Sequence, residues 1–307
     1  MANDNRLDEY LKRIESSHPT NGCTEEYLNR LQVAHLTHIP FETFDLIDIK
    51  LLNISMDHRF DRLVRQNRGG VCFQMNGLFA DMLRKLNYNA KIISCSVYNE
   101  GKHFYIEPPS HAALFVRLDN GKTFLCDVGF SNDFLTPLFF ELDSIQYATN
   151  GFFRLTKTDD QLYYKLERGY LNTDDSISLP TSSTPRTHII DIDSGRIKWT
   201  ISYRFPIDFL ESSTEIDDFQ NVVSNILYSP NVFLNHLTIC RLHTYKPNVG
   251  AYSIIGKKYY EWIIENGKET RHKYYSISDN ENELKTLLKE KFDLTIERKI
   301  ELVDNRQ

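Results

Sequence analysis

The segment Asn67-Arg68-Gly69-Gly70-Val71-Cys72-Phe73-Gln74-Met75-Asn76-Gly77 is the most informative part of this 307-residue chain. A glycine pair lets the backbone turn sharply just before Cys72. After the cysteine, apolar residues recur at helical spacing, which predicts a helix that starts there. Because a helix N-terminus favours negative charge, it favours the thiolate form of a thiol held there. Cys72 is therefore a candidate nucleophile, although a lone cysteine is more often a buried apolar residue.

A predicted hairpin brings a histidine and a carboxylate together. Residues 110–118 and 123–130 each have the short apolar runs of a strand, and Asp-Asn-Gly-Lys at 119–122 is a strong turn signal. His111 opens the first strand and Asp127 closes the second. In an antiparallel pair the start of one strand lies beside the end of the next, so we expect these two side chains to be close.

Cysteine, histidine and aspartate in this order predict a thiol-nucleophile triad. A carboxylate beside a histidine fixes its tautomer and stabilises the imidazolium, which in turn stabilises a thiolate. Cys72, His111 and Asp127 are therefore the candidate catalytic residues. This chemistry suits an acyltransferase or a hydrolase, and the three residue types alone do not separate the two.

The chain resembles the arylamine N-acetyltransferase family over almost its whole length. The family's active-site signature is Arg-Gly-Gly-x-Cys followed by Glu or Gln and then Asn, and residues 68–76 match it with Gln, as in the animal enzymes. A Pro-Phe-Glu run is matched at residues 40–42, with Thr43 where the family has Asn. The family's histidine and its Asp-x-Gly-Phe motif are matched by His111 and residues 127–130.

The resemblance implies an α+β fold in three parts, with a cysteine-protease-like triad between the first two. An N-terminal helical bundle, residues 1–90, would carry the nucleophilic cysteine. A central antiparallel β-barrel, residues 91–205, would carry the histidine and the aspartate, and a C-terminal α/β lid would span residues 206–307. The residue patterns agree, because helical signals dominate the first part, short strands the second, and the third mixes both.

The implied activity is ping-pong transfer of an acetyl group from acetyl-coenzyme A, through a thioester on Cys72, to an arylamine, a hydrazine or an arylhydroxylamine. His111 would remove the proton that the acceptor nitrogen loses, and Asp127 would hold the imidazole. Backbone amides at the start of the cysteine helix would stabilise the oxyanion. A papain-like or transglutaminase-like enzyme acting on amides is one alternative, and a non-catalytic ligand-binding protein is another.

The same resemblance suggests residues for binding the two substrates. Phe41 and Phe130 match aromatic positions of the acceptor pocket, where they would exclude water, although both also suit the core. Val97, Asn132 and Phe134 fall at positions that look like the family's selectivity positions.

Two turns are the candidates for binding coenzyme A. The segment Ser229-Pro230-Asn231 resembles the family's Ser-Pro loop, with one residue fewer. Gly129 and Ser131 lie in the turn after the aspartate. A glycine there permits close approach of a ligand, but it also suits an ordinary turn.

Composition favours a cytoplasmic enzyme that acts on small molecules. The formal net charge of −6 argues against nucleic acid or an anionic membrane as a partner, and no apolar run is long enough to span a bilayer. The five cysteines are scattered without a Cys-x-x-Cys pair, which disfavours a disulfide framework and a zinc site. We expect no metal, and a monomer whose partners are the aromatic amine and coenzyme A.

Other conspicuous residues have structural interpretations. Arg68 is expected to pair with a carboxylate such as Glu42. Cys126 is expected to point into the core by strand alternation. His35 and His38 have the spacing of a metal pair on a helix, but no third ligand cluster lies nearby in the sequence, so we expect packing or surface roles.

Overall fold

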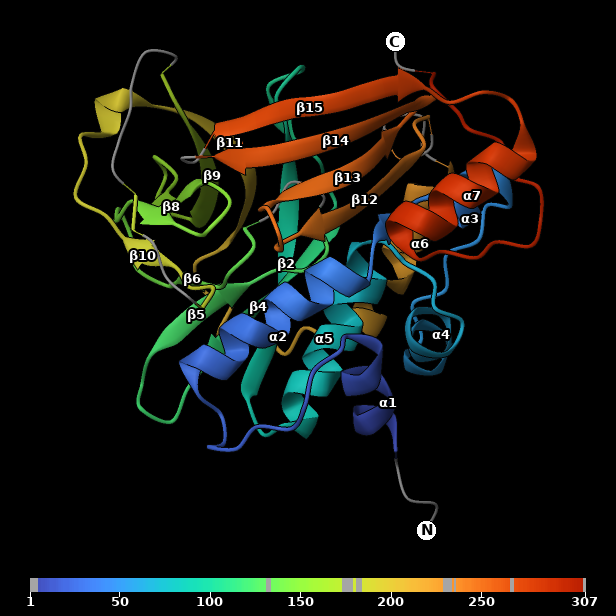
Figure 1. The fold of residues 1–307 in the computed structure, drawn as a ribbon. Helices are drawn as coiled ribbons and strands as arrows, with labels where there is room; N and C mark the ends of the chain where they lie inside the picture. Colours follow the sequence, from blue (N-terminus) through green and yellow to red (C-terminus); the bar gives the residue numbers. More distant parts are fainter. Residues whose placement is uncertain are drawn as a thin grey trace.

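The computed structural model describes residues 5–130, 134–172, 179–180, 184–228, 234, 236–265 and 268–305. These residues form an α+β fold in which helices pack against two antiparallel sheets, as expected from the sequence (Figure 1). None of the described helices is long and apolar enough to cross a membrane. The α-helices are α1 (Arg6–Arg13), α2 (Glu25–His38), α3 (Phe44–Asp48), α4 (Met56–Phe60), α5 (Cys72–Lys85), α6 (Gln220–Tyr228) and α7 (Glu281–Phe292).

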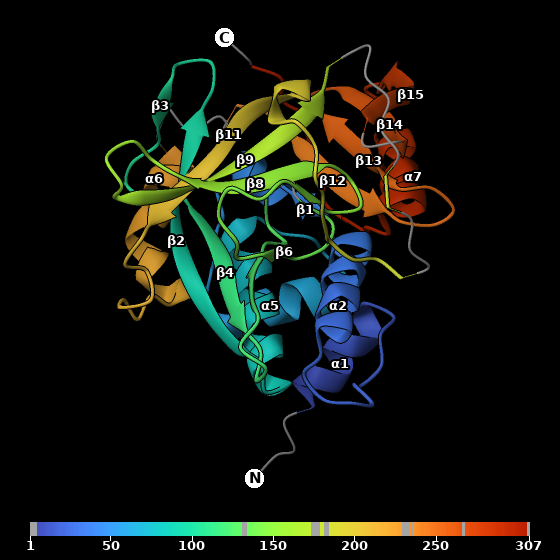
Figure 2. The ribbon, with the colours of Figure 1, turned by 90° about the vertical axis from the view of Figure 1, so that its left-hand side faces the viewer.

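The larger sheet has ten strands and curls into a half-barrel (Figure 2). Its order is β10-β7-β8-β9-β11-β2-β4-β5-β6, and β3 pairs with β2 outside this path. The strands are β2 (Asn89–Asn99), β3 (Phe104–Tyr105), β4 (His111–Arg117), β5 (Thr123–Cys126), β6 (Leu138–Phe139), β7 (Gln146–Tyr147), β8 (Phe152–Lys157), β9 (Tyr163–Leu171), β10 (His188–Ile189) and β11 (Ile197–Pro206). The predicted hairpin is β4 and β5, paired antiparallel with Leu114 opposite Cys126.

The smaller sheet joins distant parts of the chain. Its order is β1-β12-β13-β14-β15, and β1 pairs antiparallel with β12. The strands are β1 (Phe41–Glu42), β12 (Ile239–Thr244), β13 (Gly250–Ile255), β14 (Lys258–Glu265) and β15 (Lys268–Ser276). Helix α7 covers one face of this sheet, where Leu288 and Phe292 pack with Ile254 and Tyr259 (Figure 1). The sheet therefore contains a strand from the N-terminal part of the sequence.

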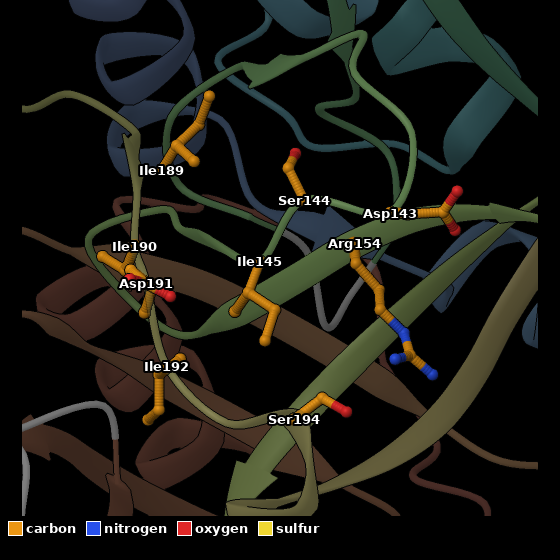
Figure 3. Close-up of a pocket in the computed structure, with 9 residues that line it drawn as sticks. All are labelled: Asp143, Ser144, Ile145, Arg154, Ile189, Ile190, Asp191, Ile192 and Ser194. Atoms are coloured by element: carbon orange, nitrogen blue, oxygen red, sulfur yellow. The ribbon is translucent and has the colours of Figure 1, made fainter.

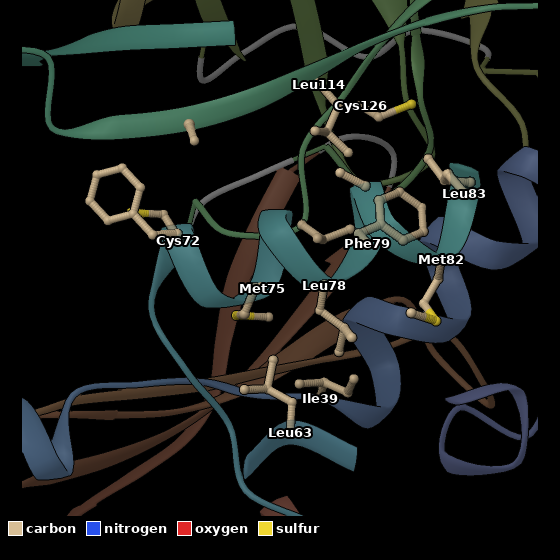
Figure 4. Packing of buried hydrophobic residues seen from close by; sticks show 14 of the residues in the cluster. Ile39, Leu63, Cys72, Met75, Leu78, Phe79, Met82, Leu83, Leu114 and Cys126 are labelled. Atoms are coloured by element: carbon tan, nitrogen blue, oxygen red, sulfur yellow. The ribbon is translucent and has the colours of Figure 1, made fainter. Parts of the chain in front are cut away.

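Helix α5 lies at the centre of the main apolar core. Its side chains Met75, Leu78 and Phe79 point into that core, and β2 and β4 pack against the helix (Figures 2 and 4). The same cluster reaches Ile216 and Ile239, so it unites all three predicted parts of the chain. The domain boundaries near residues 90 and 205 therefore stay predictions, although they fall close to the ends of elements.

Buried ion pairs fix the chain just before α5. Glu42 accepts hydrogen bonds from Arg62 at 2.5 Å and from Arg68 at 2.7 Å, which confirms the expected partner of Arg68. Arg62 also donates to the Gly69 carbonyl at 2.8 Å. Burial raises the pKa of Asp45, but its contacts with Arg62 and Arg68 outweigh that effect and hold the pKa well below its usual range. These ion pairs therefore hold the glycine turn before the cysteine in place. The Glu42 side chain at their centre is fully buried.

Replacing Glu42 with glutamine should destabilise the fold strongly. The change leaves Asp45 as the one remaining carboxylate shared by the buried Arg62 and Arg68, and breaking a buried pair costs about 3 kcal/mol or more of unfolding free energy. Glu25→Gln is the matched control, because Glu25 pairs near the surface with Lys122 and should contribute less than about 1 kcal/mol. Urea unfolding measures both, and equal losses in the two variants would contradict the argument.

Candidate active site

Cys72 is the first residue of α5, as the sequence predicts. The helix begins after Val71, whose backbone amide donates to the Gln74 side-chain oxygen at 3.2 Å. Gly69 permits the approach to the helix, because a Cβ there would lie 2.1 Å from the Pro40 carbonyl oxygen. The glycine therefore meets a steric demand of the tertiary structure. In Figure 4 Cys72 lies at the N-terminal end of the helix, beside the apolar cluster.

The β4–β5 hairpin places His111 against Asp127. His111 is the first residue of β4, and Asp127 directly follows the last residue of β5. The Nε2 atom of His111 lies 2.7 Å from Oδ2 of Asp127, and both residues are almost fully buried. The contact that the hairpin geometry predicts is therefore present.

Four donors surround the Asp127 carboxylate. Besides His111, these are Asn76 Nδ2 at 2.8 Å, the Gly129 amide at 3.0 Å and the Tyr203 hydroxyl at 3.0 Å. Asn76 stands one helical turn after the cysteine and also accepts the Val128 amide, so it ties α5 to the aspartate turn. The carboxylate therefore has a fixed orientation although it has no contact with water.

The imidazole of His111 connects this carboxylate to the thiol. Nε2 faces Asp127 at 2.7 Å, and the Cys72 sulfur lies close enough to act on the pKa of the ring. Burial lowers the pKa of His111, but the Asp127 carboxylate and the Cys72 sulfur more than compensate and raise that pKa well above its usual value. The Cys72 sulfur also lies 3.8 Å from the Ser110 carbonyl oxygen. An imidazolium beside the sulfur favours the thiolate.

Access to the sulfur is narrow. Cys72 is 7% exposed, so it is neither sealed nor open. Phe41 and Phe130 line a cavity of about 10 Å³ next to the start of α5, together with Met75 and Val128. The Phe130 ring centroid lies 5.2 Å from that of His111.

The remaining predicted substrate residues are placed differently. Val97 lies on β2, opposite Tyr203 of β11, and is partly exposed. Phe134 is fully buried and packs on Phe153 with ring centroids 5.6 Å apart, so its side chain belongs to the half-barrel core. Its role in selectivity stays a prediction. Asn132 lies outside the described residues.

The predicted coenzyme A residues are described only at Gly129. A Cβ on Gly129 would lie 2.6 Å from the Cys72 Cα and 2.7 Å from Asn76 Nδ2. The glycine is therefore required by the packing of the aspartate turn on α5, and its role in binding coenzyme A stays a prediction. The other candidates, Ser131, Ser229, Pro230 and Asn231, lie outside the described residues.

Sequence reasoning missed two partners of the aspartate. In the sequence Asn76 stands out only as a motif position, and its helical spacing of four from Cys72 is the signal that points to its role. Tyr203 gave no local signal, because its contact depends on the pairing of β11 with β2. Cys126 is fully buried, as expected. His35 is also buried and hydrogen-bonds with the Tyr10 hydroxyl, which is a packing role.

Two further observations concern sites away from the triad. A cavity of about 540 Å³ lies beside β7, β8 and β10, lined by Ile145, Arg154, Ile189 and Ser194 among others (Figure 3). None of the triad residues or their partners lines it. No group of three or more His, Cys, Asp and Glu side chains within the described ranges could hold a metal ion.

A thiol beside an imidazole that is hydrogen-bonded to a buried carboxylate is the arrangement of cysteine-nucleophile enzymes. Comparison with known proteins narrows this class. The model of the N-acetyltransferase family matches residues 24–301. The chain therefore belongs to the arylamine N-acetyltransferase family and is an acyltransferase, as the sequence motifs indicate.

Relatives and solved structures agree with this family. The liver isozyme of arylamine N-acetyltransferase from Gallus gallus is 23% identical over 306 residues, which cover 96% of this chain and 97% of the relative. The arylamine N-acetyltransferase of Salmonella typhimurium has a similar fold, with a TM-score of 0.75, 20% identity and coverage of 94% and 91% of the two chains. The Mycobacterium marinum enzyme in complex with CoA gives a TM-score of 0.70 at 18% identity and covers 94% and 92%.

Asp127→Asn should slow alkylation of the Cys72 thiol. Without the carboxylate, burial dominates and the pKa of His111 falls, so the imidazolium that favours the thiolate is lost at neutral pH. We expect alkylation by iodoacetamide at about pH 7 to slow by at least about tenfold, measured by peptide mass spectrometry at Cys72. Tyr203→Phe is the control, since it removes one neutral donor and keeps the charge. Unchanged rates in Asp127→Asn would show that the carboxylate does not act through His111.

The raised pKa of His111 should also appear in the pH dependence of stability. Protonated His111 is favoured by folding, so its contribution is complete below the unfolded value near 6.5 and is lost as pH rises through the higher folded value. The difference in unfolding free energy between the wild type and His111→Gln should therefore be larger at about pH 5.5 than at about pH 9.5. A difference that is constant or grows with pH would contradict this sign.

Proposed function

We propose that the protein transfers an acetyl group from acetyl-coenzyme A to an arylamine, a hydrazine or an arylhydroxylamine through a thioester on Cys72. The observation that carries the proposal is the position of Cys72, the first residue of α5, beside His111, whose ring is hydrogen-bonded to the buried Asp127 carboxylate. The names of the relatives support the acceptor class, since they are arylamine N-acetyltransferases. The CoA complex of the M. marinum protein supports the donor.

In the first half-reaction, Cys72 is the nucleophile. Because its raised pKa leaves His111 protonated at neutral pH, the Cys72 thiolate is already paired with the imidazolium, and it attacks the thioester carbonyl. The carbon–sulfur bond to coenzyme A then breaks, and the imidazolium donates its proton to the departing thiolate. The amides of Cys72 and Phe73 stand in the first turn, where no carbonyl of the helix can accept them, and they are the proposed donors to the oxyanion.

In the second half-reaction, the acceptor nitrogen attacks the acetyl-cysteine. His111 accepts the proton that the nitrogen loses as the new carbon–nitrogen bond forms. The Cys72 thiolate leaves and is again stabilised by the imidazolium, while Asp127 keeps the ring in position. His111 therefore donates a proton in the first half of the cycle and accepts one in the second half.

The apolar walls at the triad would keep the thioester dry. Phe41 and Phe130 line the small cavity there, and we propose that an aromatic acceptor enters by widening it. Val97, Asn132 and Phe134 are proposed to adjust its selectivity. Exclusion of water separates transfer from hydrolysis, because water competes with the amine for the acyl-enzyme.

The coenzyme A contacts and the setting remain parts of the proposal. Gly129, Ser131 and the segment 229–231 are the proposed contacts near the thioester, by resemblance to the family. In the proposed domain organisation, residues 1–90 carry the nucleophile, residues 91–205 carry His111 and Asp127, and residues 206–307 form a lid. All five cysteines are free thiols, which supports a reducing compartment such as the cytoplasm. We further propose that the protein is a monomer.

Incubation with acetyl-coenzyme A in the absence of an amine should give a stable covalent intermediate. The intact mass should rise by one acetyl group, located at Cys72 by peptide mapping, and addition of an arylamine should remove it. Cys72→Ala should fold normally and show neither the adduct nor turnover. Turnover by the wild type without a detectable adduct would exclude this mechanism. Activity retained in Cys72→Ala would exclude it as well.

A further inference from the structure

The smaller sheet has two faces of different chemistry. Strand alternation and the packing of α7 assign Leu242, Ile254 and Tyr259 to the covered face. The alternate residues therefore point to the opposite face, and Arg241 and Ser253 confirm this by a hydrogen bond of 3.2 Å from Arg241 to the Ser253 hydroxyl. On the opposite face, α2 packs against β12, where Leu36 and Ile39 lie beside Arg241 and His243, while Tyr274 at the other edge of the sheet is exposed.

Strand register places a continuous row of side chains on this face. Phe41 of β1 stands opposite Arg241 of β12, Arg241 opposite Ser253 of β13, Ser253 opposite Tyr260 of β14, and Tyr260 opposite Tyr274 of β15. Phe41 forms an isolated bridge with Gly70, two residues before Cys72, and is 8% exposed, whereas Tyr274 at the outer edge is 53% exposed. The row therefore leads from the proposed reaction site to the surface.

The outer end of the row is aromatic and cationic. The Tyr260 ring stacks on Trp262 at 5.4 Å and on Tyr274 at 6.1 Å, each with an interplanar angle of 15°. The Arg271 guanidinium lies 4.2 Å from the centre of the Tyr274 ring. We call Tyr260, Trp262, Arg271 and Tyr274 the aromatic row. Parallel rings beside an arginine are suited to a flat base that carries phosphate.

Charge on this face fits an anion. The residues that β12, β13 and β14 contribute to it include Arg241 and Lys258 and no carboxylate, although the chain as a whole has a net charge of −6. Trp262 Nε1 and His243 Nδ1 are buried on the same face and have no hydrogen-bond partner in the described part of the chain. An indole N–H is a donor only, so a ligand acceptor could satisfy it.

We propose that the aromatic row binds the adenine nucleotide end of the acetyl-coenzyme A donor, with the base stacked on the rings and phosphate oxygens on Arg271. This proposal rests on the function proposed above. Tyr260 lies three strand spacings from Phe41, about 14 Å. The pantetheine arm is roughly as long as four or five extended residues, about 15 Å, so it can connect the two places.

The test removes the exposed half of the aromatic row and compares two acetyl donors. Arg271→Gln combined with Tyr274→Ala should raise KM for acetyl-coenzyme A about tenfold, as expected for one lost stacking contact and one cation. The turnover at saturating donor should be unchanged. With S-acetylcysteamine, which lacks the nucleotide, kcat/KM should equal that of the wild type. Inhibition by adenosine 3′,5′-bisphosphate should weaken by a similar factor.

A matched control lies on the same strand. Lys273→Gln combined with Tyr275→Ala removes one cation and one tyrosine from the α7 face, where Tyr275 packs on Tyr259 at 5.1 Å. This variant should keep the wild-type KM for both donors. An equal rise in KM in both double variants would mean that β15 acts only through stability, and the proposal would be wrong.

Two further outcomes would contradict the proposal that the aromatic row binds the nucleotide. The proposal fails if the row variant keeps its KM for acetyl-coenzyme A, or if it changes only self-association, which would assign this edge strand to a second copy of the chain. Failure of the proposed function looks different. In that case neither donor acetylates Cys72. Direct titration would still show weaker binding of adenosine 3′,5′-bisphosphate to the row variant than to the control variant.

Discussion

The buried carboxylate of Asp127 is the interaction on which the rest of the site depends. It receives donors from the β4–β5 hairpin, from the cysteine helix through Asn76, from its own turn at Gly129 and from β11 through Tyr203. Such a charge is tolerable inside a protein only when its oxygens are satisfied. The same four bonds that make the charge tolerable also fix His111 beside Cys72. Stability and chemistry are therefore supported by one set of contacts.

Steric limits act together with this electrostatic centre. Gly69 lets the chain pass the Pro40 carbonyl, and Gly129 lets the aspartate turn approach the Cys72 backbone. The ion pairs of Glu42 hold the first of these passages, since Arg62 binds both Glu42 and the Gly69 carbonyl. The position of the sulfur is thus set from both sides of the helix start, by groups that take no part in bond making.

Local signals were sufficient for much of the fold. Helical spacing after Cys72 gave the start of α5, and the Asn-Gly turn gave the β4–β5 hairpin, because both depend on neighbours in sequence. The motif resemblance supplied the family and the overall α+β architecture. The fully buried place of Phe134 was not predicted, because an apolar residue after a turn suits a pocket wall and a core equally well.

Long-range pairing was beyond local reasoning. Tyr203 reaches Asp127 only because β11 lies beside β2. No sequence pattern near residue 203 predicts that β11 pairs with β2. The same holds for β1, which is two residues long and belongs to a sheet whose other strands begin at residue 239. The aromatic row likewise exists only through the registers of four strand pairs.

The pairing of β1 with β12 has a consequence for the order in which the molecule can be made. During synthesis the backbone of Phe41 and Glu42 emerges long before its partners Arg241 and Cys240. Until β12 has been synthesised, Phe41 and Glu42, which lie beside the glycine turn, lack their partner strand. The cavity that Phe41 lines is then also incomplete. Contacts so distant along a chain form late and slowly. The reactive sulfur thus acquires its finished surroundings only when the ribosome has nearly completed the chain.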